Sequence, residues 1–165
     1  MNGLTGTRRC ARPVRIALSH FLGGDIDGAW WPHTSSLANE LPDLIAALHP
    51  PLGEITDIGV NWSSTDGTPD LNSMYYGTAT LPGSRPRRQR LIRVAGQREC
   101  IKLLVVPSMT SAALGLMVLR MAAGLRIPDS QCETKLFKTA DCVVRAAQAE
   151  GASWAMRVAS GEPAP

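Results

Sequence analysis

Residues 14–36, VRIALSHFLGGDIDGAWWPHTSS, contain the pattern that decides the fold at the start of the chain. Two strand-like stretches, 14–22 and 25–31, stand on either side of a glycine pair that favours the tight turn of a β-hairpin. Pro32 cannot continue a strand ladder, and the hydroxyl side chains after it suit the start of a helix. The segment therefore predicts an N-terminal hairpin that leads directly into a helix.

A two-residue turn at the glycine pair also sets the expected register of the hairpin. Counting back from the turn pairs Ala17 with Trp30. The same count pairs His20 with Asp27. Because successive side chains of a strand point to opposite faces, we expect Trp31 in the main core and Trp30 on the other side of the sheet. An uncovered Trp30 would form an exposed aromatic patch, which is typical of a binding surface. The alternative is that the C-terminal helix covers this face of the sheet.

The rest of the chain alternates between helical and strand-like patterns. A stripe of leucines predicts a helix over residues 36–49, with a kink at Pro42 and an end at Pro50–Pro51. Two further helices are expected over residues 110–125 and 133–150. The predicted strands that follow the hairpin cover residues 54–62, 74–81, 89–95 and 99–107.

These elements predict an α+β fold. We expect an antiparallel sheet of about five or six strands that opens with the hairpin. Two main helices, the kinked helix and the helix after Pro107, are expected on one face of this sheet. Residues 1–12 are expected to form a mobile arm, 13–126 the α+β domain, and 127–165 a C-terminal helical tail packed on the domain with a frayed end.

Length and composition indicate a globular protein with a packed core. The chain has 165 residues, of which 44% are hydrophobic and 19% charged. A chain of this length buries roughly 70% of its unfolded surface. The net charge of +3 is too small to attract nucleic acid or anionic lipid by itself. With no secretory signal at the start and no apolar run of about 20 residues, the sequence favours a cytoplasmic protein that does not enter the membrane.

The cysteines predict no metal site. The chain has four, Cys10, Cys100, Cys132 and Cys142, and they are far apart, without a histidine at zinc-ligand spacing. We expect reduced thiols and no metal or cofactor.

The first candidate site lies around the hairpin, and its residues are Asp25, Asp27, Trp30 and His33. A carboxylate beside an imidazole, as in the expected pair of His20 and Asp27, is an arrangement that general bases and metal ligands use. No nucleophile stands in an identifiable place beside this pair, so a structural role is favoured. A small-molecule site or an enzyme with a cleft near Asp25, Asp27 and His33 is the alternative.

The second candidate site is an arginine-rich turn that contains Arg85, Arg87, Arg88, Arg90 and Arg93. These side chains could contact phosphates, but no aromatic stacking partners are interleaved with them and no nucleic-acid-binding motif is present. We expect a solvated surface turn with at most weak, salt-sensitive affinity for nucleic acid.

The stretch DGAWWPHTSSLANELPDLIAAL, followed by LGEITDIGVNW and later by RLIRVAG and KLLVVP, resembles an actinobacterial, mycobacterial-type family of small proteins catalogued as a domain of unknown function. The resemblance covers residues 12–106. It implies a cytoplasmic bacterial protein and brings no activity or catalytic residue that could be transferred to this chain.

The leading interpretation is a non-enzymatic binding or protein-interaction module whose partner is a second copy or another protein. The hairpin pattern has two apolar sides, and two-fold pairing is the commonest way to cover such a side. We therefore expect a homodimer with Trp30 near the centre of its interface and Trp154 as a possible contributor.

Overall fold

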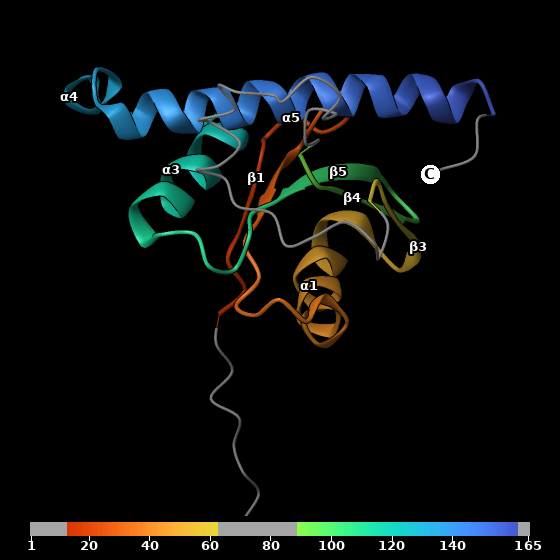
Figure 1. Ribbon diagram of the computed structural model, residues 1–165. Helices are drawn as coiled ribbons and strands as arrows, with labels where there is room; N and C mark the ends of the chain where they lie inside the picture. Colours follow the sequence, from red (N-terminus) through yellow and green to blue (C-terminus); the bar gives the residue numbers. More distant parts are fainter. Residues whose placement is uncertain (1–12, 63–88, 162–165) are drawn as a thin grey trace, which may run out of the picture.

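The described residues form a five-stranded β-sheet as the middle layer of the fold (Figure 1). The computed structural model describes residues 13–62 and 89–161. In chain order the elements are β1 (Ile16–Leu18), β2 (Gly28–Trp30), α1 (Leu37–Leu52), β3 (Ile55–Val60), β4 (Leu91–Gly96), β5 (Cys100–Val105), α3 (Ala112–Ala122), α4 (Asp129–Cys132) and α5 (Lys135–Ala159).

The strands lie in the order β1-β2-β5-β4-β3. All neighbouring strands are antiparallel except β2 and β5, which run parallel. The α+β class and the approximate strand number are confirmed, whereas the expectation of a purely antiparallel sheet is wrong. The chain passes through α1, β3 and β4 before β5 returns beside β2, and such a long connection permits parallel pairing. The strand expected at residues 74–81 lies outside the described residues.

The register of the first hairpin differs from the expected one by a single residue. Ile16, not Ala17, pairs with Trp30. β1 and β2 are short and are joined by residues 19–27, so a two-residue turn does not set their pairing. A shift of one residue exchanges the faces of every side chain in a strand. Trp30 therefore packs on the α1 side and Trp31 on the side of α3 and α5.

Both faces of the sheet are covered within the chain (Figure 1). On one face, Leu44, Leu48 and Leu52 of α1 pack in a cluster with Trp30. On the other face, side chains of α3 and α5 surround Trp31. Trp30 is 1% exposed, so its face is covered within the chain, but by α1 and not by the C-terminal helix or a second copy. The expectation that α1 and the helix after Pro107 share one face of the sheet is also wrong. That helix is α3, and it packs on the face opposite α1.

Helix α1 continues three residues beyond its expected end. It includes Pro50 and Pro51, and it ends at Gly53, which adopts a φ of 75° and donates its N–H to the His49 carbonyl. Each proline lacks the N–H that would bond back into the helix and weakens the last turn, yet the helical backbone continues to Leu52. The stop comes from Gly53, because a residue with positive φ cannot continue a right-handed helix.

Helix α5 completes the second core and is longer than expected. Its inner face supplies Val143, Val144 and Trp154 to the cluster around Trp31. Gly151 lets the helix approach the loop before β2, because a Cβ at this position would collide with the backbone carbonyl of that loop. The C-terminal segment expected to form a tail is therefore part of the packed core.

Candidate functional site

Asp27 is a buried carboxylate that organises the loop between β1 and β2. Its side chain is 1% exposed. Oδ1 accepts hydrogen bonds from the N–H groups of Gly23 (2.6 Å) and Gly24 (3.1 Å), and Oδ2 accepts one from the N–H of Lys102 (2.9 Å). The Asp27 N–H also donates to the Lys102 carbonyl at 2.7 Å. The carboxylate thus attaches the loop to β5 through backbone groups.

The other residues of the first candidate site have separate surroundings. His20 and Asp25 are exposed. The expected cross-strand pair of His20 and Asp27 does not form, because the shifted register places Ser19 opposite Asp27, with the Ser19 N–H donating to the Asp27 carbonyl at 2.7 Å. His33 Nε2 lies 2.9 Å from the Pro13 carbonyl oxygen. A ligand cleft near Asp25, Asp27 and His33 remains a prediction, and within residues 13–62 and 89–161 no three His, Cys, Asp or Glu side chains are grouped to hold a metal.

Of the arginines in the second candidate site, Arg85, Arg87 and Arg88 lie outside the described residues. The guanidinium of Arg90 lies over the ring of Trp62, 5.3 Å from its centroid. The Nε of Arg93 lies 3.3 Å from Cys100 Sγ. The aromatic neighbour of Arg90, Trp62, lies two residues after the end of β3 and not in the arginine-rich turn, which is why sequence spacing did not reveal it.

Arg15 and Trp31 form a second arginine–tryptophan stack. The guanidinium lies 3.6 Å from the ring centroid and donates to the carbonyls of Trp31 (3.1 Å) and Pro32 (2.9 Å). Gly115 on α3 lies against the Trp31 ring, and a Cβ at this position would stand only 2.6 Å from ring carbons. Trp31 is 4% exposed and its Nε1 has no hydrogen-bond acceptor among the described residues. This tryptophan is a packing residue of the core, not a surface anchor.

A buried polar cluster joins α5 to β3 and β4. Asn61 Nδ2 donates to the Gln89 carbonyl (2.9 Å) and to Glu150 Oε1 (3.2 Å), and its Oδ1 accepts from the Leu91 N–H (2.8 Å). The same Glu150 oxygen forms a 2.7 Å salt bridge with Arg157. Its members come from distant parts of the sequence, so no local pattern indicated it. The cluster satisfies backbone groups at the strand ends, as buried polar networks commonly do.

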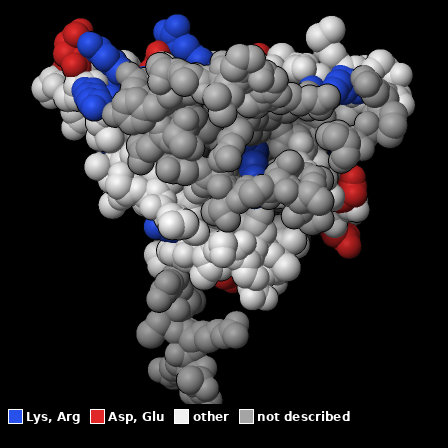
Figure 2. Space-filling view, viewed as in Figure 1, with Lys and Arg blue, Asp and Glu red and all other residues white. Residues whose placement is uncertain are grey.

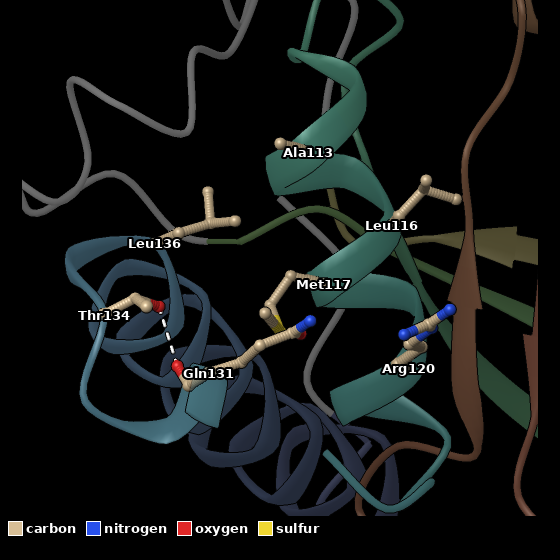
Figure 3. Close-up of a pocket in the computed structure, with 7 residues that line it drawn as sticks. All are labelled: Ala113, Leu116, Met117, Arg120, Gln131, Thr134 and Leu136. Atoms are coloured by element: carbon tan, nitrogen blue, oxygen red, sulfur yellow. Dashed lines mark hydrogen bonds between the residues drawn. The ribbon is translucent and has the colours of Figure 1, made fainter. Parts of the chain in front are cut away.

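A hollow of about 390 Å³ lies between α3 and the corner formed by α4 and the start of α5, and we call it the α3–α4 hollow (Figure 3). It is lined by Ala113, Leu116, Met117, Arg120, Gln131, Thr134 and Leu136. Leu116 and Arg120 project on one side of α3, and Gln131 extends from α4 toward Met117 (Figure 3). Thr134 Oγ1 is already bonded to the Gln131 carbonyl at 2.7 Å. The lining is therefore mainly apolar, with one charged group at its rim.

The rim of the α3–α4 hollow exposes one large apolar side chain. Leu116, which lines the hollow, is 52% exposed. Figure 2 shows Lys, Arg, Asp and Glu side chains gathered along the upper margin of the molecule, where Figure 1 shows α4 and α5. Arg120 forms no ion pair with any described residue. None of these residues was among the predicted site residues, because on sequence alone α3 is indistinguishable from a fully buried core helix.

A comparison with protein families matches residues 14–122 to DUF5994, a family of unknown function. The chain belongs to this family. The DUF5994 match takes in the whole sheet, α1 and α3, and it ends before α4 and α5. The α3–α4 hollow thus lies across the end of the matched region. Comparisons with curated proteins and with solved structures gave no match. Among the described helices, none is long and apolar enough to cross a membrane.

Proposed function

We propose that this DUF5994 protein is a non-enzymatic protein-interaction module that binds a partner protein through the α3–α4 hollow. The observation that carries the proposal is the combination of a mainly apolar hollow with the exposed side chain of Leu116 on its rim. Exposed apolar side chains grouped around a concavity mark sites of protein interaction more often than isolated ones do. This surface replaces Trp30 as the expected point of contact.

The chemistry of the lining defines the partner. An apolar side chain of the partner would enter between Leu116 and Leu136 and remove both from water. A carboxylate of the partner, placed beside that side chain, would pair with Arg120, which has no ion-pair partner in the described part of the chain. We therefore expect a peptide segment in which leucine, methionine or phenylalanine stands near aspartate or glutamate.

A small-molecule or enzymatic role at the hairpin is the weaker candidate. The oxygens of Asp27 already accept three backbone N–H groups. A carboxylate that holds the backbone in this way has little capacity left for a substrate.

Following the resemblance of the tryptophan segment, we also propose a bacterial, actinobacterial origin and a cytoplasmic location.

A peptide-display selection against the full chain tests the proposal. Selected peptides would be titrated against the wild-type protein and Leu116→Asp, with Met156→Asp as the matched control. Met156 is 74% exposed on α5, away from the hollow lining, so the control makes a similar change at a different surface. The proposal expects apolar, acidic peptides whose affinity falls at least about tenfold in Leu116→Asp alone. Peptides that bind both variants equally, or a selection without binders, would overturn it.

A further inference from the structure

Strand β3 is an outer strand of the sheet. In the described part of the chain it pairs with β4 alone. Its sequence, ITDIGV, contains no lysine or proline, and the two features that commonly protect an edge strand, a charged side chain and a bulge, lie at Asp57 and just before it, so residues 58–60 carry neither. A bulge between Ile55 and Asp57 is its only irregularity.

The hydrogen bonds of β3 show which of its backbone groups face outward. The Asn61 N–H donates to the Leu91 carbonyl at 3.2 Å, so Asn61 directs its backbone toward β4. Inward and outward residues alternate along an antiparallel strand. Gly59 therefore also faces β4, and the N–H and C=O groups of Ile58 and Val60 point away from the sheet.

We propose that β3 pairs antiparallel with β3 of a second copy of this chain, with a two-fold axis at Gly59. This register places Ile58 opposite the partner's Val60 and, by symmetry, Val60 opposite the partner's Ile58. Each pair exchanges N–H···O=C bonds in both directions. Gly59 stands opposite its own copy, and no atom lies within 4 Å of the position of its absent Cβ. The two sheets join into one continuous sheet.

The side chains of this register are compatible on both faces. Ile58 and Val60 lie two residues apart and so share one face, the face on which Ile58 packs against the α1 cluster. Val60 is 38% exposed in the single chain and would be covered by the partner's Ile58. Cross-strand pairs of β-branched residues stabilise antiparallel sheets.

The charges favour this register over the one with the two-fold axis at Ile58. With the axis at Gly59, Asp57 stands opposite the partner's Asn61, and the two Asp57 carboxylates are about 13 Å apart along the strand direction. At about 10 Å and beyond, salt screens most of the repulsion between exposed charges. An axis at Ile58 would bring the carboxylates to about 7 Å and would draw the bulged residues into the pairing.

The proposed contact is small, because it involves one short strand from each copy. Interfaces at the low end of the size range belong to weak and transient complexes, so we expect a reversible dimer with a dissociation constant in the micromolar range. The contact uses β3, whereas the proposed partner site uses α3 and α4. The two proposals can therefore fail independently.

Val60→Pro tests the dimer, with Val60→Thr as its matched control. Proline removes the outward N–H of Val60 without removing a hydrogen bond to β4, and edge strands tolerate proline at such positions. Threonine keeps the N–H and the β-branched shape. Sedimentation of the full chain over a concentration series should give a dimer for wild type and Val60→Thr, and a dissociation constant at least about thirtyfold weaker for Val60→Pro.

Amide hydrogen exchange of the wild-type protein provides a second measurement that needs no variant. Exchange at the Ile58 and Val60 amides should slow as the protein concentration rises, whereas the Gly59 amide, which faces β4, should be protected at every concentration. A wild-type chain that stays monomeric at high micromolar concentration would overturn the proposal. So would a folded Val60→Pro protein that dimerises as well as wild type, or exchange at Ile58 and Val60 that does not change with concentration.

Discussion

Replacing Asp27 with asparagine tests the structural role of the buried carboxylate. The amide can keep its single oxygen against the N–H groups of Gly23 and Gly24, but its amino group then faces the Lys102 N–H, and two donors oppose each other. A hydrogen bond to a charged group contributes about 1.5–3 kcal/mol, and a buried donor left without an acceptor costs about 1–3 kcal/mol. Because the glycine N–H groups are only partly buried, we expect Asp27→Asn to lower the free energy of unfolding by about 2–4 kcal/mol.

Urea unfolding, followed by tryptophan fluorescence and circular dichroism, measures this loss. Asp25→Asn is the matched control, since Asp25 is exposed two residues away and the same change there should stay within about 0.5 kcal/mol of wild type. The midpoint should fall in Asp27→Asn with an unchanged slope. If the two variants differ by less than about 1 kcal/mol, the carboxylate does not hold the loop to β5, and the interpretation of Asp27 as a structural residue is wrong.

Three further changes examine the packing of the two cores. Gly115→Ala should destabilise the protein by about 1–3 kcal/mol in the same assay, because the new Cβ would collide with the Trp31 ring. This loss is expected although alanine favours a helix over glycine by about 1 kcal/mol. A stabilised variant would contradict the close contact between Gly115 and the ring. Trp30→Ser should cost about 3–5 kcal/mol, since Trp30 is 1% exposed, and near wild-type stability would show that the side chain is not in the core. A chain that ends at residue 126 should bind a hydrophobic dye and lose its near-ultraviolet circular dichroism, whereas a folded monomer would show that α5 is dispensable.

Local patterns in the sequence were sufficient to locate most of the elements. The leucine stripe gave α1, and the short β-branched run before Pro107 gave β5, because each pattern follows from burial of one side of a regular element. The parallel pairing of β2 with β5 had no local signal, since it depends on where the chain returns after β4. Long-range pairing of this kind is decided by the packing of the whole domain, not by the residues of either strand.

The hairpin register shows how one buried polar group overrides a turn pattern. Gly23 and Gly24 suit a two-residue turn, but Asp27 accepts hydrogen bonds from both of their N–H groups and holds them in a wider loop. The resulting shift of one residue places Trp30, not Trp31, on the same side as Ile16 and α1. Trp30 is buried because helices cover both faces of the sheet, which the hairpin pattern does not predict. A carboxylate close to a glycine pair is therefore as informative about the loop as the glycines themselves.

The DUF5994 match ends at residue 122, whereas the core that surrounds Trp31 does not. Val143, Val144 and Trp154 of α5 cover apolar side chains of β2 and α3, which belong to the matched region. A chain that stopped at the end of the match would expose this face of its sheet to water, at a cost of about 25 cal/mol for each Å² of apolar surface. It would also lack the α4 side of the α3–α4 hollow. In this protein, then, the C-terminal helices both stabilise the DUF5994 domain and build half of the surface through which we propose that it binds its partner.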